Sequence, residues 1–482
     1  MNIFDIKSSQ KQFVKLALLS LPFLSLTTAC SDDFLDAVPE TTVAYENSLY
    51  TPARVLAQVN GLYATIKSGS FLGGRYLIYN DIRAEEFINR NANGVTGLGV
   101  WNHTAGADDT YIANFWTVGY LTINRANLFL EGLEENAASI DPTLGQQYRG
   151  EAKLLRALSY FSLVQIFAKP YILDNGASPG LPLRLQGETT IENNTLARST
   201  VAQIYAQILQ DLNDAETDLP ESYSTATLNT TRAHKSTAIA LKTRVYLAMG
   251  QYANVITEAN KIVPAAAPFV TATGVQHQLQ ANIATVFTTY TTTESIFSLP
   301  MASTNAPGTQ NQLGYYFNSG NREYYLNTAA IGIYNNPQFE ADDVRKTALT
   351  ATISGQQYVT KFSGVSPYVD WVPVIRYAEV LLNLAEAEAE AGDQSRAVAL
   401  LQAVHNRSDA TWAYSGTTQE DLITAILTER RIELLAEGFR ANDILRRGDN
   451  IVSAGAGATI TPSDARYIFS IPTSEVQSNT AL

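Results

Sequence analysis

The sequence has little of several residue types, and each shortage excludes a class of protein. Its 482 residues include a single cysteine, which excludes a disulfide framework and a cysteine-based zinc site. Lys and Arg number 33 against 46 Asp and Glu, so the formal net charge is −13, and no basic block occurs. Because phosphate binding needs clustered basic side chains, nucleic acid is excluded as the main partner. The four histidines form no HExxH motif and no local metal pair, so we expect no histidine metal site and no cofactor.

The first thirty residues resemble an export signal. Three lysines are followed by the apolar run LALLSLPFLSL at 16–26, which is too short to span a bilayer as a helix. The run leads to Ala29-Cys30, and Cys30 is the only cysteine. This pattern is typical of a bacterial lipoprotein, so we predict that residues 1–29 are a signal peptide and that Cys30 carries the lipid. An ordinary secretory signal with an incidental cysteine is the alternative.

The rest of the chain is expected to form an acidic tether at 30–50 and one helical domain at 51–482. The tether is polar and shows no hydrophobic period, whereas the domain begins with Thr51-Pro52, a helix N-cap followed by proline. Apolar residues at helical spacing predict a first helix that ends before Gly69, and further helices at 111–133, 146–167, 201–217 and 417–437.

Two helix pairs share one pattern. Predicted helices at 237–249 and 252–263 flank Gly250, and helices at 378–391 and 395–404 flank Gly392. This rhythm is typical of tetratricopeptide repeats, but the two copies lie far apart and form no tandem array. Between the helices lie loop-rich insertions at about 68–110, 168–200, 264–376 and 405–417, with strand character at 286–300 and 357–362. The predicted fold class is therefore all-α, with tetratricopeptide-like pairs and minor β insertions.

Five segments together resemble the SusD/RagB family of outer-membrane lipoproteins from Bacteroidetes: SDDFLD after Cys30, LLRALSYFSLVQIFAKPY at 154–171, VIRYAEVLLNLAEAEAEAG at 374–392, ERRIELLAEGFRANDILRRGD at 429–449, and IFSIPTSEVQSN at 468–479. They occur in the family's order and are spread across nearly the whole mature chain. The resemblance implies a tetratricopeptide-like all-α fold with the ligand site on a variable face. It also implies a surface position on the outer membrane, and a SusC-like TonB-dependent transporter as partner.

The segment at 429–449 is interpreted as structural. Arg430, Arg431, Glu433 and Glu437 lie at helical spacing, so we expect ion pairs along one helix, which Arg440, Asp443 and Arg446 would extend. The same helix is expected to begin with a capping box of Thr417 and Glu420 and to end at Gly438.

The sequence offers no convincing catalytic arrangement. We interpret the four histidines as surface or loop groups, and the pairs Glu85-Glu86, Asp108-Asp109 and Asp342-Asp343 as charges on solvated loops. Asp108 and Asp109 are considered as calcium ligands, although loop charge is the simpler interpretation. A G-x-S-x-G match at 176–180 contains Pro179, which has no N–H to stabilise an oxyanion. We therefore predict no catalytic residues and no enzyme.

The aromatic residues of the insertions are the candidate ligand contacts. Sugar rings present flat C–H faces and hydroxyl rims, so a receptor needs exposed Trp or Tyr rings beside amide or carboxylate groups. The predicted contacts are Trp101, Asn102, Tyr315, Tyr316, Tyr324 and Trp371. The expected function is non-catalytic capture of a neutral oligosaccharide for a TonB-dependent transporter. The alternatives are a peptide-binding member of the same family, a surface glycosidase or esterase, and a pure interaction scaffold.

Overall fold

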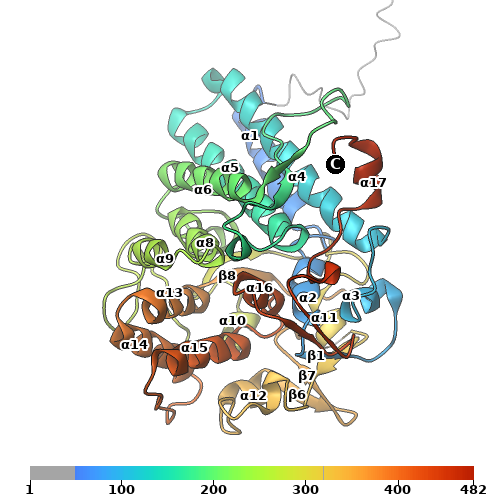
Figure 1. Ribbon diagram of the computed structural model, residues 1–482. Helices are drawn as coiled ribbons and strands as arrows, with labels where there is room; N and C mark the ends of the chain where they lie inside the picture. Colours follow the sequence, from blue (N-terminus) through green and yellow to red (C-terminus); the bar gives the residue numbers. More distant parts are fainter. Residues whose placement is uncertain (1–48, 319) are drawn as a thin grey trace, which may run out of the picture. The chain divides into compact units, whose positions relative to one another are not determined.

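The computed structural model describes residues 49–318 and 320–482. The predictions for the signal peptide, Cys30 and nearly all of the tether lie outside the described residues. Helices account for 48% and strands for 9% of the structure, which confirms the predicted all-α class. Figure 1 shows many of the longer helices side by side, with β8 among them and β1, β6 and β7 near one another. The helices are α1 (Pro52–Ile66), α2 (Arg75–Ile82), α3 (Leu98–Trp101), α4 (Thr110–Glu135), α5 (Pro142–Phe167), α6 (Val201–Asp218), α7 (Ala226–Thr231), α8 (Lys235–Ala248), α9 (Tyr252–Ala259), α10 (Ala284–Thr288), α11 (Leu313–Phe317), α12 (Val344–Ala348), α13 (Tyr377–Ala391), α14 (Gln394–His405), α15 (Gln419–Glu433), α16 (Arg440–Arg446) and α17 (Thr473–Ser478).

Side-chain caps define where the long helices begin. The Thr51 side chain accepts from the Arg54 N–H at the start of α1, with Pro52 as the first helical residue. Asp109 caps α4, Asp141 caps α5 before Pro142, and Thr200 forms a capping box at α6. These caps satisfy N–H groups that have no partner inside the helix. The helices predicted at 111–133, 146–167 and 201–217 are therefore confirmed, with ends shifted by a few residues.

The two predicted tetratricopeptide-like pairs are present and are neighbours in space. α8 packs on α9, α13 packs on α14, and α9 packs on α13. Gly250, between α8 and α9, has φ +68°, a left-handed backbone that glycine adopts without steric cost. The long insertion at 264–376 therefore leaves the stack after α9 and returns to it at α13.

In the part of the chain that the structure describes, the strands form five two-stranded antiparallel sheets. They pair as β1 (Phe87–Asn89) with β5 (Tyr324–Leu326), β2 (Pro179–Pro182) with β3 (Arg198–Thr200), β4 (Ser295–Leu299) with β8 (Val372–Arg376), β6 (Thr350–Ile353) with β7 (Gln356–Val359), and β9 (Ile451–Ser453) with β10 (Ala458–Ile460). The strand prediction for 286–300 is partly wrong, because the segment begins inside α10 and becomes β4 only later. The prediction for 357–362 corresponds to β7 and the residues after it.

Helix α2 corrects the loop assignment at 68–110. All eight of its residues are buried, although they include Arg75, Asn80 and Asp81. The Asp81 carboxylate accepts from the Gly438 N–H at 2.7 Å, and burial raises the pKa of Asp81 to about 7. A short helix that is buried on every side, with polar residues among its apolar ones, lacks the single apolar stripe that identifies a surface helix in sequence.

The predicted helix at 417–437 is shorter than expected. α15 spans Gln419–Glu433. Its capping box is formed by Thr418 and Asp421, one residue later than the predicted pair of Thr417 and Glu420. Gly438 does have φ +82°, but it lies beyond the helix end. No helix among the described residues is both long enough and apolar enough to cross a lipid bilayer.

Glycine is required at 438 by both conformation and space. A Cβ there would lie 2.6 Å from the Leu77 Cα, a backbone atom of α2, on a left-handed backbone. We therefore expect Gly438→Ala to lower the free energy of unfolding by about 2 kcal/mol or more. Gly61→Ala is the matched control: Gly61 lies inside α1, where an added Cβ would meet no atom within 4 Å, so we expect a gain of about 0.5–1 kcal/mol. Urea unfolding measures the change in stability of both variants, and equal changes would contradict the requirement for glycine at 438.

Candidate functional site

The structure separates the six predicted ligand contacts into three groups. Trp101 ends α3, is half-buried, and donates its indole N–H to the Phe87 carbonyl at 2.9 Å. Asn102 is also half-buried, and its side-chain oxygen accepts from the N–H and the hydroxyl of Thr104 at 3.2 and 2.7 Å. The indole N–H of Trp101 and the side-chain oxygen of Asn102 are thus used within the protein, which leaves the ring surface of Trp101 and the Asn102 amide N–H groups for a ligand.

Tyr316 and Tyr324 correct the prediction. Both side chains are 0% exposed, and their rings stack on each other with centroids 6.2 Å apart and planes 5° apart. The Tyr324 hydroxyl donates to the Thr96 carbonyl at 3.0 Å. They are therefore core residues that attach α11 to β5, and neither can contact a ligand at the surface.

Trp371 pairs with a residue that sequence reasoning missed. Its ring stacks on that of Tyr290, with centroids 5.2 Å apart and planes 8° apart, and both side chains are half-buried. Tyr290 has φ +42°, which is unusual for a bulky residue and is found most often at functional sites. Trp371 directly precedes β8, and Tyr290 lies between α10 and β4, so the pairing of those strands brings the rings together.

A second aromatic pair belongs to the same loop. Tyr368 packs edge-on against Tyr315, with ring centroids 5.8 Å apart, and Tyr315 is half-buried. Tyr368 also has a positive φ, +57°. The loop at 363–371 thus carries one partner of each pair. We call Tyr290, Tyr315, Tyr368 and Trp371 the aromatic face.

The 363–371 loop is fixed by a buried carboxylate. Asp370 is 6% exposed, and its two oxygens accept from the Gly364 N–H at 3.0 and 3.1 Å. The Tyr290 hydroxyl donates to the same carboxylate at 3.4 Å. A Cβ at Gly364 would lie 2.7 Å from an Asp370 oxygen, so this closure requires glycine. Burial raises the pKa of Asp370, while the hydrogen bonds it accepts partly offset that rise.

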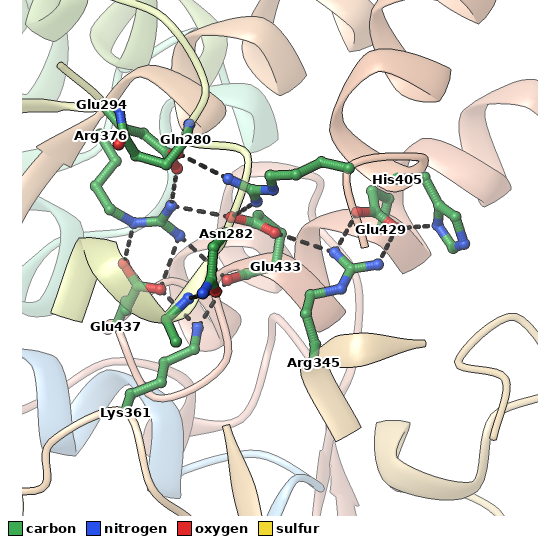
Figure 2. Close-up of polar contacts among 12 residues, drawn as sticks. Gln280, Asn282, Glu294, Arg345, Lys361, Arg376, His405, Glu429, Glu433 and Glu437 are labelled. Atoms are coloured by element: carbon green, nitrogen blue, oxygen red, sulfur yellow. Dashed lines mark hydrogen bonds and ion pairs between the residues drawn. The ribbon is translucent and has the colours of Figure 1, made fainter. Parts of the chain in front are cut away.

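A buried cluster of charged side chains joins the insertion to α15 (Figure 2). Arg376 contacts Glu294, Glu433 and Glu437 at 2.6, 2.9 and 2.6 Å. The remaining members are Asp343, Arg345, Lys361, His405, Arg407 and Glu429. We call these ten residues the ionic core.

The ionic core is structural rather than catalytic. Its carboxylates are fully or almost fully buried, and each is paired with a cation. Burial alone would raise the pKa of Glu433, but the guanidinium groups of Arg407, Arg376 and Arg345 lower it well below its usual value. A cavity beside Glu437 has a volume of about 30 Å³, which accommodates about one water molecule and no sugar ring.

The predicted ion pairs along one helix are corrected by these contacts. Glu433 and Glu437 pair with residues of the insertion, and Arg430 pairs with Asp443 of α16 at 3.0 Å. Arg431 and Arg440 pair with Glu85 and Glu86, and Arg446 pairs with Glu386 and Asp443. Of the predicted set, only the Asp443–Arg446 pair is local. The structural interpretation remains, but the segment joins distant parts of the chain instead of stabilising its own helix.

The other polar candidates are also redefined by burial. His405 is fully buried at the end of α14, which corrects the prediction of a surface or loop group. His234 and His277 lie in loops as that prediction allowed but are also fully buried, whereas His103 is half-buried. Burial lowers the pKa of His234 to about 3 and that of His277 to about 4. Glu85, Glu86 and Asp343 are buried and paired with arginine, so these are not solvated loop charges. Asp109 caps α4 by accepting from Tyr111 and Ile112.

A larger cleft of about 320 Å³ opens elsewhere, over the ends of α6, α8 and α9. Charged and polar side chains line it together with two isoleucines, and no aromatic ring does: Glu216, Thr217, Glu221, Lys235, Ser236, Ile239, Lys261, Ile262 and Thr273. Because sugar recognition uses aromatic platforms, this cleft is a weaker candidate than the aromatic face.

Comparison with known families gives two matches that together cover almost the whole chain. Residues 33–247 match a family described as "Starch-binding associating with outer membrane". Residues 166–482 match the SusD family. Among curated proteins, SusD-like protein P38 of Formosa agariphila is 23% identical over 90% of this chain and 92% of its own length.

Solved structures share the fold. A SusD superfamily protein from Bacteroides fragilis superposes with a TM-score of 0.82 and 34% identity, covering 90% of this chain and 99% of that one. A laminarin-binding SusD-like protein superposes with a TM-score of 0.69 and 23% identity, covering 89% and 98%.

Removing Arg376 would leave Glu294, Glu433 and Glu437 without their shared buried cation. We expect Arg376→Met to lower the free energy of unfolding by about 3–5 kcal/mol, because an unpaired buried charge is strongly destabilising. Arg466→Met is the matched control, since Arg466 pairs with Asp464 and the two side chains are 46% and 26% exposed, and we expect a change of less than about 1 kcal/mol. Denaturant unfolding measures both variants, and a similar loss in the two would contradict the structural role of the ionic core.

Proposed function

Because the chain belongs to the SusD family, we propose that it is a non-catalytic, outer-membrane lipoprotein that binds a neutral oligosaccharide and delivers it to a TonB-dependent transporter. The observation that carries the glycan assignment is the stacked pair of Tyr290 and Trp371 on the loop closed by Asp370. Flat aromatic rings in fixed positions suit the C–H faces of sugars.

The surroundings of the aromatic face supply hydrogen-bonding groups. The Gln310 amide lies 3.4 Å from the Tyr315 hydroxyl, and the Asn318 amide donates to the Phe362 carbonyl at 3.1 Å. Asn318 is half-buried. With a net charge of −13 on the whole chain, a neutral glycan is favoured over an anionic one. The description of the related family as starch-binding, and the laminarin-binding relative, also support a neutral glycan.

Absence of catalysis is part of the proposal. Glycosidases need two carboxylates that face the substrate, whereas Glu85, Glu86 and Asp343 are each paired with arginine in the protein interior. Asp370 is held by backbone donors in the same way. These carboxylates are therefore occupied by structural contacts, which favours capture over hydrolysis.

The glycan assignment predicts a specific loss on removing one ring. We expect Trp371→Ala to weaken binding of a retained polysaccharide about tenfold or more, since one lost ring contact removes roughly 1.4 kcal/mol or more. Trp101→Phe, on a different element, should bind as the unmodified chain does. Affinity gels containing laminarin, starch or mannan measure polysaccharide binding by each variant, and thermal melts verify that each variant is folded.

Three outcomes would contradict the assignment. Loss of binding in Trp101→Phe with none in Trp371→Ala would place the site elsewhere. Retention of members of a peptide library, with no polysaccharide retained, would favour the peptide-binding alternative. Hydrolysis of a retained glycan would support the alternative that the chain is a surface glycosidase or esterase.

The membrane assignment rests on Cys30 and on the family's association with the outer membrane. We expect Cys30→Ala to move the product from the outer-membrane fraction to soluble fractions outside the cytoplasm, because the lipid would be lost. The unmodified chain should copurify with a barrel-forming transporter from detergent extracts. Cell fractionation with immunoblotting measures the location of the Cys30→Ala product. Unchanged membrane attachment of Cys30→Ala would contradict lipidation, and isolation of the unmodified chain without a barrel would contradict the transporter partner.

A further inference from the structure

Three carboxylates from two distant segments meet near the end of α14. They belong to Glu340 and Asp342 of the long insertion and to Asp409, which follows α14. One oxygen of each lies within 4.8 Å of the others. The two segments are joined beside the cluster, because the Val344 N–H donates to the Ser408 carbonyl at 3.0 Å.

Asp409 is the buried member of the cluster and has an oxygen without a partner. The residue is 5% exposed. Its Oδ1 accepts from the Thr411 N–H, the Thr411 hydroxyl and the Trp412 N–H at 3.1, 3.0 and 3.2 Å. Its Oδ2 is buried and accepts no hydrogen bond, and it lies 4.0 Å from Nε2 of His405. A buried carboxylate oxygen with free lone pairs is costly unless a ligand satisfies it.

Apart from His405, the cluster has no basic partner in the part of the chain that the structure describes. Among the described residues, no lysine or arginine lies within ion-pair distance of Glu340, Asp342 or Asp409. Yet neighbouring Asp343 contacts Arg345 at 2.7 Å. Three adjacent carboxylates repel one another when each carries a negative charge. A cation bound among them would offset that repulsion and supply a partner for the buried Asp409 oxygen.

We propose that Glu340, Asp342 and Asp409 bind Ca²⁺. The donors are all carboxylate oxygens, which suit a hard cation, and Ca²⁺ takes 6–8 oxygens at roughly 2.3–2.6 Å. Two ligand oxygens of one such ion can lie almost 5 Å apart, in agreement with the spacing within the cluster. Glu340 and Asp342 are exposed, so water can complete the coordination. Mg²⁺ demands a smaller, near-octahedral shell and suits this open site less well.

A bound ion would join the insertion to the helical scaffold. Asp342 is followed by Asp343 and Arg345, and Arg345 contacts Glu429 of α15, which also accepts from His405 at 2.6 Å. The ion would thus stabilise the attachment of the insertion at a second place, beside the ionic core. This inference is independent of the glycan proposal. Sequence reasoning predicted no metal site because Glu340 and Asp409 lie far apart in the chain.

Terbium luminescence offers a test specific to this position. Tb³⁺ replaces Ca²⁺ at oxygen sites and emits when a nearby tryptophan is excited. Trp412 follows Asp409 closely, and its ring stacks on His405 with centroids 4.1 Å apart. We expect the chelator-treated chain to show sensitised Tb³⁺ emission that Ca²⁺ displaces and that Trp412→Phe abolishes. Absence of emission, or emission that persists in Trp412→Phe, would overturn the assignment.

Thermal melting supplies the second readout. With Ca²⁺ at about a hundredfold excess over its Kd, we expect the Tm of the chelator-treated chain to rise by about 3 °C. The double variant Glu340→Gln/Asp342→Asn changes only exposed side chains, so it should fold normally and lose both the Tm rise and the emission. Asp141→Asn, an exposed acidic position on another loop, should retain both. Equal Ca²⁺ responses in the double variant and the unmodified chain, or no Tm rise in the unmodified chain, would overturn the proposal.

Discussion

Pairing of buried charges between the insertion and α15 is the constraint on which the rest of the structure depends. Glu433 of α15 contacts Arg345, Arg376 and Arg407, which come from separate segments. Each of these charges is almost wholly removed from water, so it is tolerated only while its partners are in place. Because the partners lie far apart in sequence, this requirement fixes the position of the insertion on the scaffold.

The aromatic face follows directly from this constraint. Trp371 precedes β8, the strand that ends at Arg376, and Tyr290 lies shortly before Glu294. Ser295, which follows Glu294, is paired with Arg376 in the β4–β8 sheet. Both strands therefore extend from residues of the ionic core. The 363–371 loop begins just after Lys361, another member of the core. Both rings of the stacked pair are therefore positioned by strands that the ionic core fixes, while the face itself stays at the surface. A rigid base with a variable loop above it is a common arrangement for binding sites.

Helix positions could be predicted from sequence because they depend on local signals. The apolar spacing and caps of α1, α4, α5 and α6 are visible without knowledge of any partner. The short buried helix α2 was missed because its polar residues are buried against distant partners such as Gly438. The same limit applies to the site. Tyr315 and Tyr316 are adjacent and chemically alike, yet only the packing of Tyr316 on Tyr324 determines which ring is buried. The stacking of Tyr290 on Trp371 likewise arises from strand pairing across the insertion, which composition does not reveal.

The central claim is that ligand contacts the aromatic face while the ionic core beneath stays fixed. Hydrogen–deuterium exchange of the purified chain, with and without an oligosaccharide that it retains, tests this most directly. We expect slower exchange on binding at 286–293 and 363–371, with no change in α15, whose amides should already be protected. Protection confined to the segment around Trp101, or to the α6–α8–α9 cleft, would contradict the claim.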